Sequence, residues 1–310
     1  MRRVAALALA ASLAACAGLP PEAPALPGVA AAGAAALPES VWLRDVPFVA
    51  QPDWQCGPAA LSIAMAAAGR PVPVGVLADS AFVPGLQGTL QAEMLAASRR
   101  QGMLATELAP SLDALRSELA AGRPVIVLQN LGLAAWPKWH YAVLVGYDTA
   151  AGEVRLHSGD QASMTMRLWT FERTWARSGR WAIALTPPSE LPVSADEASA
   201  VRAVIGLERV DAKGAAQAWE TVLARWPQSR LALFGRANRL LAGGDARAAA
   251  DGYRAAIAVD PAFADAWNNL AQALASLGDR AAASEAADRA IALGGPHLPA
   301  YRDTRASIGR

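Results

Sequence analysis

The chain has 310 residues, of which 54% are hydrophobic and 18% are charged, and its formal net charge is +1. After residue 16 it holds no Lys/Arg run beyond Arg99-Arg100, so we expect no nucleic-acid partner. The histidines lie in no cluster with metal-ligand spacing, and no phosphate-cradling glycine loop occurs, so we expect neither a metal nor a cofactor.

Residues 1–16 have the pattern of an export signal. Two arginines precede an apolar run, Val4–Ala15, which is shorter than the roughly 20 residues that span a bilayer but suits the core of a signal peptide. The run ends in Leu13-Ala14-Ala15-Cys16, which resembles a bacterial lipoprotein box. This resemblance implies cleavage before Cys16 and lipidation of its thiol; an ordinary secretory signal that contains a cysteine is the alternative.

Several acyl chains on one cysteine anchor a protein stably, where a single chain binds only marginally. Ala17-Gly18 follows Cys16, so the aspartate that would resemble an inner-membrane retention signal is absent after the cysteine. We therefore expect a lipid anchor in the outer membrane, with the protein facing the periplasm.

Composition divides the remainder into three parts. Residues 17–40 are rich in Ala, Pro and Gly and predict a flexible linker, because they cannot bury a core. Residues 41–190 mix strand and helix patterns, and residues 196–310 are helical and repetitive. Prolines at 187, 188 and 192 mark the boundary, and we expect them to limit packing across it.

Cys56 is the first candidate for chemistry. Besides Cys16 it is the only cysteine, so it has no disulfide partner in an oxidising compartment. Pro58–Ala68 predicts a helix, with proline in its first turn and Gly69 after its end. Free N–H groups at such a helix start favour a thiolate, so we expect a lowered thiol pKa. A buried structural thiol is the alternative.

A glutamine upstream offers a second group for this site. The side-chain amide of Gln51 can stabilise an oxyanion beside the backbone N–H of Cys56, and Gln55 is the alternative. Trp54, Trp136 and Trp139 flank the proposed site in sequence, where they either wall a substrate cleft or simply pack.

Two neighbouring strands supply the base. A buried strand over residues 124–129 precedes a second, residues 139–147, with His140 at its start. A turn follows, and residues 153–157 return antiparallel. If Tyr147 faces Glu153, Asp160 lies opposite His140 and Ser158 lies diagonally on the same face. Asp160 is therefore predicted to orient the imidazole, with Ser158 as the alternative, and a register slip of one residue would remove the carboxylate.

These residues resemble a known family. Cys56 followed by Gly-Pro-Ala-Ala-Leu, the upstream Gln51, and His140-Tyr-Ala-Val-Leu-Val-Gly-Tyr resemble the papain-like cysteine peptidases over residues 44–185. The bacteriocin-processing, double-glycine-leader peptidases are the most similar group. The resemblance implies an α+β papain-like fold, with Cys56 as nucleophile, Gln51 as oxyanion residue and His140 as general base. Where that family has Asp-Pro, this chain has Ser158-Gly159-Asp160.

The C-terminal part repeats at an interval of 34 residues. Gly244-Asp245 recurs as Gly278-Asp279, and Pro227 recurs as Pro261. The segment from Ala266 to Ala271 resembles the tetratricopeptide repeat. We predict two to three repeats and a capping helix near 297–309, stacked as an all-α solenoid that binds an extended peptide or a protein. A plain helical bundle is the alternative.

The combined prediction is a cell-envelope cysteine peptidase that cleaves peptide bonds through a thioester on Cys56. Its substrate is a peptide or protein, and the repeats recruit a protein partner while folding independently of residues 41–190. Two alternatives remain open: a non-catalytic peptide-binding adaptor on a peptidase-like fold, and an amidase or transferase that uses the same Cys–His pair.

Overall fold

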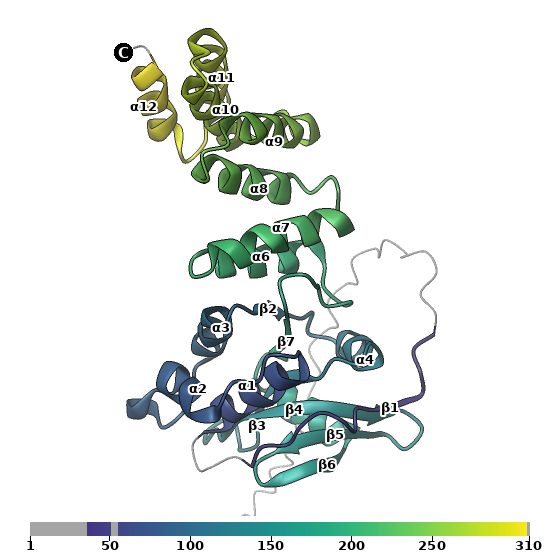
Figure 1. The fold of residues 1–310 in the computed structure, drawn as a ribbon. Helices are drawn as coiled ribbons and strands as arrows, with labels where there is room; N and C mark the ends of the chain where they lie inside the picture. The colour runs from purple at the N-terminus through teal and green to yellow at the C-terminus, as the bar shows by residue number, and fades with distance from the viewer. Residues whose placement is uncertain (1–35, 51–54, 309–310) are drawn as a thin grey trace, which may run out of the picture. The chain divides into compact units, whose positions relative to one another are not determined.

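The computed structural model describes residues 36–50 and 55–308. Within them, an α+β region (residues 37–186) is followed by a connecting segment (residues 187–196) and a helical region (residues 197–308) (Figure 1). No helix in the described ranges combines the length and the apolar character needed to cross a bilayer.

The α+β region is built on one antiparallel sheet with the strand order β2-β7-β3-β4-β5-β6, and β1 pairs with β4. The β-branched and aliphatic residues of the central strands fill both faces, so β3 is buried along its whole length. The strands are β1 (Ser40–Trp42), β2 (Leu104–Glu107), β3 (Val125–Asn130), β4 (Trp139–Asp148), β5 (Glu153–Ser158), β6 (Gln161–Arg167) and β7 (Ala182–Thr186).

Helices cover both faces of this sheet. α1 packs on the face that carries Ile126 and Val143, whereas α4 and α5 pack on the face that carries Val127 and Leu144. Alternate residues of each strand therefore serve two separate cores. The helices are α1 (Cys56–Ala67), α2 (Val74–Ala81), α3 (Gln91–Arg100), α4 (Leu112–Ala120) and α5 (Leu168–Ala176), with a short 3-10 helix at Pro84–Leu86.

The helical region confirms the predicted repeats: it contains three helix pairs and a closing helix. Asp211, Asp245 and Asp279 recur because each caps the second helix of a pair, its carboxylate accepting an N–H three residues on. Gly235 is required where helices cross, since a Cβ there would lie 2.5 Å from the Trp219 ring. The helices are α6 (Glu197–Glu208), α7 (Ala212–Arg225), α8 (Arg230–Ala242), α9 (Ala246–Val259), α10 (Ala264–Ser276), α11 (Arg280–Leu293) and α12 (Leu298–Ile308).

The expectation that the repeats form a core independent of the rest is wrong. Leu104 of β2 is fully buried in the same apolar cluster as Ala200 and Val204 of α6. Gly206 of α6 also lies against the guanidinium of Arg99 from α3, where a Cβ would be only 2.3 Å from its Cζ. The core of the helical region therefore extends through α6 onto β2 of the α+β region.

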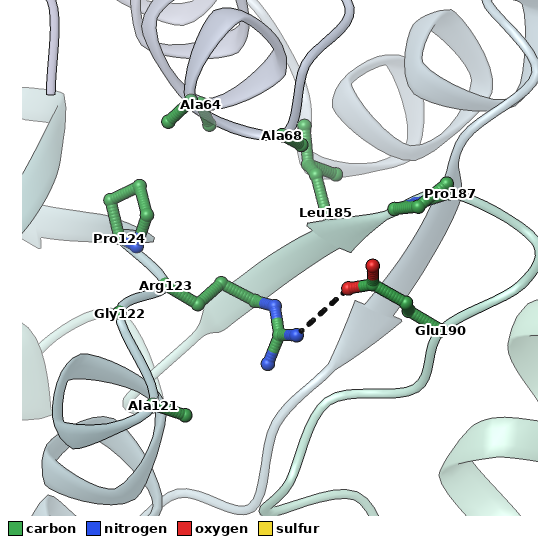
Figure 2. A pocket seen from close by; sticks show the side chains of 10 residues that line it. Ala64, Ala68, Ala121, Gly122, Arg123, Pro124, Leu185, Pro187 and Glu190 are labelled. Atoms are coloured by element: carbon green, nitrogen blue, oxygen red, sulfur yellow. Dashed lines mark hydrogen bonds and ion pairs between the residues drawn. The ribbon is translucent and has the colours of Figure 1, made fainter.

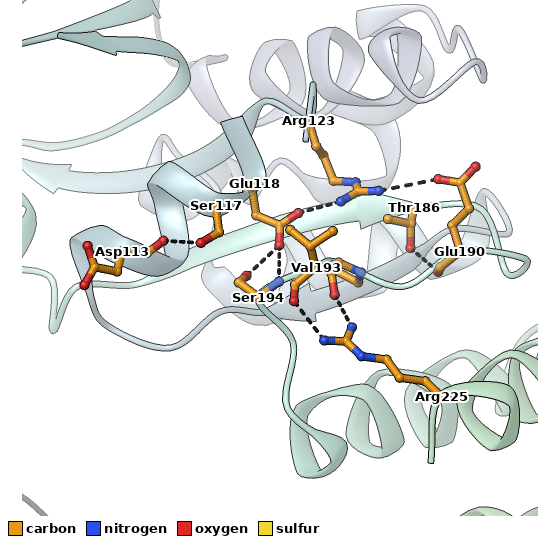
Figure 3. Close-up of polar contacts among 10 residues, drawn as sticks. Asp113, Ser117, Glu118, Arg123, Thr186, Glu190, Val193, Ser194 and Arg225 are labelled. Atoms are coloured by element: carbon orange, nitrogen blue, oxygen red, sulfur yellow. Dashed lines mark hydrogen bonds and ion pairs between the residues drawn. The ribbon is translucent and has the colours of Figure 1, made fainter. Parts of the chain in front are cut away.

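The connecting segment is hydrogen-bonded to both regions (Figure 3). On one side, Glu118 of α4 is fully buried; its Oε1 accepts from Ser194 N at 2.7 Å and Ser194 Oγ at 2.6 Å, and its Oε2 accepts from Arg123 at 2.5 Å. On the other side, Arg225 of α7 donates to the carbonyls of Pro192 and Val193. The prolines thus do not separate the two regions.

Candidate active site

Cys56 is the first residue of α1 and a half-buried free cysteine. The helix was predicted to begin at Pro58, but it begins two residues earlier. Cys56 itself therefore lies in the first turn, where backbone N–H groups have no intrahelical partner. Its side chain packs against the core between α1 and the sheet.

The Cys56 thiol meets β4 at Tyr141. Burial raises the pKa of Cys56, and hydrogen bonds from the backbone N–H groups of Tyr141, Gly57 and Cys56 itself offset only part of that rise. The expected lowering of the thiol pKa is therefore wrong. The helix start does supply donors, but the sulfur is enclosed between α1 and β4, and loss of hydration disfavours the thiolate more than these donors favour it.

His140, the second residue of β4, precedes Tyr141, so it adjoins the residue whose N–H meets the Cys56 sulfur. Its Nε2 lies 2.9 Å from Oγ of Ser158, the last residue of β5. If Nε2 carries the hydrogen and donates it to Ser158, Nδ1 keeps a lone pair that can accept a proton.

Burial lowers the pKa of His140, and the positive charge of Lys138 lowers it further. The sequence did not suggest a role for this lysine. Together with the raised pKa of Cys56, this shift favours a neutral thiol beside a neutral imidazole near pH 7, rather than a thiolate–imidazolium pair.

The prediction that Asp160 lies opposite His140 is wrong. Tyr147 pairs with Val154, not Glu153, and a bulge between Leu144 and Gly146 then changes the offset. Beyond the bulge Val143 pairs with His157, as the prediction required, but the ladder stops there.

Asp160 is exposed because the chain turns back before it could pair with β4. Ser158 pairs with Gln161, so Gly159 and Asp160 form a two-residue turn, with φ of 62° at the glycine. Ser158, the diagonal alternative, is the residue that reaches His140. The Gly-Asp pair between two strand-like runs was the sequence signal for this turn.

Three predicted residues lie outside the described residues: Gln51, the oxyanion candidate, Trp54, one of the cleft candidates, and Cys16, the lipidation candidate. Gln55 is described and precedes α1, where its carbonyl accepts the N–H of Ala59 and its side chain makes no capping bond. The choice between the two glutamines therefore stays a prediction.

Two of the predicted tryptophans precede His140: Trp136 lies in the loop between β3 and β4, and Trp139 is the first residue of β4. Trp136 is 77% exposed and Trp139 is 51% exposed. The loop is held by Asn130, whose Oδ1 accepts the N–H groups of Gly132 and Lys138, both at 2.9 Å. Both rings are therefore free to contact a substrate, as the cleft hypothesis requires.

A cavity of about 210 Å³ lies at the opposite end of α1 from Cys56 (Figure 2). Small apolar side chains such as Ala64 and Ala68 line it, and the ion pair between Arg123 and Glu190 spans it at 3.4 Å. Its lining contains no Cys, Ser or His, and its one carboxylate, Glu190, is paired with Arg123.

The model of the Peptidase_C39 like family matches residues 43–183. A search of curated proteins finds no match to the chain.

Three solved structures are similar. A protein described as a C39-like peptidase from Bacillus anthracis is 20% identical over 47% of this chain and 97% of its own, with a TM-score of 0.40. The peptidase domain of Streptococcus ComA, a bifunctional ABC transporter involved in quorum sensing, is 21% identical over 46% of this chain and 98% of its own, with a TM-score of 0.38.

The third structure, the Sgt2 TPR domain from Aspergillus fumigatus, is 23% identical over 36% of this chain and 79% of its own, with a TM-score of 0.33. The family match and the element order give the chain a C39-like, papain-type α+β fold followed by an all-α region of repeated helix pairs.

Proposed function

We propose that this protein is a cysteine peptidase of the cell envelope, with Cys56 as nucleophile and His140 as general base. One observation carries the proposal: His140 Nε2 bonds Ser158 while the next residue, Tyr141, meets the Cys56 sulfur. This arrangement places the proposed base next in the chain to the residue that meets the proposed nucleophile, within the residues that the C39-like family model matches.

The reaction begins with the neutral pair. His140 Nδ1 takes the thiol proton as Cys56 Sγ bonds the carbonyl carbon of the peptide, and the carbonyl electrons move onto oxygen. N–H groups at the start of α1, together with Gln51 or Gln55, stabilise this oxyanion. Ser158 Oγ accepts from the imidazolium and so holds its orientation.

The intermediate then collapses to a thioester. The C–N bond breaks, and the imidazolium of His140 gives its proton to the departing amine. Water next attacks the thioester with His140 again acting as base, which releases the carboxylic acid and restores the Cys56 thiol.

Ser158 and Asp160 can be separated by mutation. We expect Ser158→Ala to lower kcat about fivefold, because one hydrogen bond that orients the base is worth about 1 kcal/mol. Asp160→Asn should leave kcat within about twofold, since Asp160 lies exposed in a turn. Steady-state kinetics on one peptide would measure both. A loss in Asp160→Asn without a loss in Ser158→Ala would return the orienting role to Asp160.

The helical region is proposed to recruit a protein partner or the substrate protein, since stacked helix pairs provide an extended binding surface.

Cys16 is proposed to carry the lipid that holds the protein at the outer membrane. Cys16→Ser should therefore block acylation and shift the protein into soluble fractions or leave its signal uncleaved. Unchanged membrane fractionation with an intact acyl group would contradict the anchor.

A non-catalytic adaptor is the second candidate function. Two observations favour it: a neutral serine, not a carboxylate, partners His140, and burial raises the pKa of Cys56. Digestion of a peptide library by the purified protein, read by mass spectrometry, separates the two. New peptide ends that vanish in Cys56→Ala support the peptidase, whereas binding of peptides without cleavage supports the adaptor.

A further inference from the structure

His157 is a buried, polar residue that the proposed reaction does not use. Its side chain is 3% exposed and lies on β5 directly before Ser158. Its Nδ1 accepts the backbone N–H of Ser163 at 3.0 Å, so Nε2 carries the ring hydrogen and donates to the carbonyl of Val46 at 3.2 Å. The two hydrogen bonds define one neutral tautomer.

The bond to Ser163 lies at a break in the sheet. Leu156 pairs with Met164 and Ser158 pairs with Gln161, so the single residue His157 faces two residues of β6. Ser163 has a φ of 52°, which is uncommon for a serine. The imidazole therefore supplies the acceptor for an N–H group that the irregular ladder leaves without a strand partner.

The bond to Val46 lies on the other side of the ring. Val46 belongs to the segment between β1 and Cys56, and the ring of Phe48 in the same segment meets His157 edge-on, with centroids 5.4 Å apart. His157 thus touches the chain that leads to the nucleophile, while the next residue along β5, Ser158, bonds the base.

We propose that His157 is a positioning residue: it holds the Val46–Phe48 segment against β5 and fixes the bulge that keeps Ser158 against His140. The inference rests on the proposed function, because the groups it positions are the proposed Cys–His pair. It acts through hydrogen bonds of its two ring nitrogens, and neither nitrogen is left over for the substrate.

Two substitutions separate these bonds. In His157→Asn the side-chain oxygen takes the place of Nδ1 and keeps an acceptor for Ser163, whereas in His157→Gln the amide nitrogen takes the place of Nε2 and keeps a donor for Val46. We expect Gln to lower kcat about tenfold at nearly constant KM, because loss of the bulge bond moves Ser158 away from His140. Asn should lower kcat less and so act as the conservative rescue.

Two further measurements make the test independent of hydrolysis. The ring N–H signal of His140 in NMR and the rate of Cys56 alkylation by iodoacetamide both report on the pair even if no peptide is cleaved. We expect both to change in His157→Gln, and the His140 signal to keep its wild-type position in His157→Asn. His297→Asn is the matched control, because that histidine is exposed, directly precedes α12 and bonds Asp265 of α10 in the helical region.

If His157→Gln and His157→Asn lower the melting temperature equally and leave the His140 signal and the alkylation rate at wild-type values, His157 only packs and the inference is overturned. If those two readouts change as expected in a protein that cleaves no peptide, the positioning role holds and the peptidase proposal alone fails.

Discussion

Replacing Cys56 by Ala should lower peptide hydrolysis by at least about a thousandfold, because no other group can form the thioester. The fold should survive, since alanine is small and suits the first turn of α1. His140→Ala should cause a loss of similar size, because a thiol whose pKa burial has raised depends on a base to remove its proton.

The measurement is kcat/KM for one peptide in the wild type and the two single variants. The double variant should be no worse than either single one, because the two residues act as a unit. Thermal unfolding of each variant controls for loss of structure. Wild-type turnover in Cys56→Ala would show that the nucleophile is another residue.

Replacing Glu118 by Ala should lower the free energy of unfolding by about 3 kcal/mol. The fully buried carboxylate bonds Arg123 and both donors of Ser194, so its removal leaves these groups with fewer partners and frees the connecting segment. The side chain of Arg123 is only 16% exposed, so water compensates little. Urea titration of the full chain would measure the change.

Glu190→Gln is the matched control. Glu190 bonds the same arginine at 3.4 Å, but its side chain is 59% exposed, so its loss should cost less than about 1 kcal/mol. Equal effects of the two substitutions would mean that the buried Glu118 contact does not hold the connecting segment in place.

The contact between α6 and β2 limits how far the chain can be shortened from its C-terminal end. Deleting residues 196–310 removes α6, which covers Leu104, so the remaining α+β region should aggregate. Deleting residues 230–310 keeps α6 and α7 and should leave it soluble. A soluble product with normal hydrolysis from the larger deletion would contradict the shared core.

The helical region could be predicted from the sequence because its signals are local and periodic. An aspartate caps the second helix of each pair, and small residues recur where helices cross. Each unit contacts mainly its neighbours, so an interval of 34 residues in sequence carries the architecture. The boundary between the α+β region and the helical region was harder to predict. From the sequence Glu118 looks like an ordinary surface charge on a helix, and only the structure shows that Ser194 covers it.

The parts of the site that depend on local sequence motifs could be predicted, whereas the parts that depend on strand pairing in the sheet could not. The start of α1 and the strand position of His140 follow from proline placement and apolar runs. The partner of His140 does not, because a bulge near Gly146 and the turn at Gly159 set the register. The direction of the Cys56 pKa shift also depends on burial by β4, which no local pattern contains.

The most direct test of the peptidase proposal is to trap the covalent intermediate. The purified protein would be mixed with a peptide that it cleaves, quenched with acid within the first turnover, and examined by mass spectrometry after digestion. The proposed mechanism predicts an acyl group on Cys56 that hydroxylamine removes and that is absent in His140→Ala. Cleavage of the peptide with Cys56 unmodified under conditions where an added thioester standard survives would contradict it.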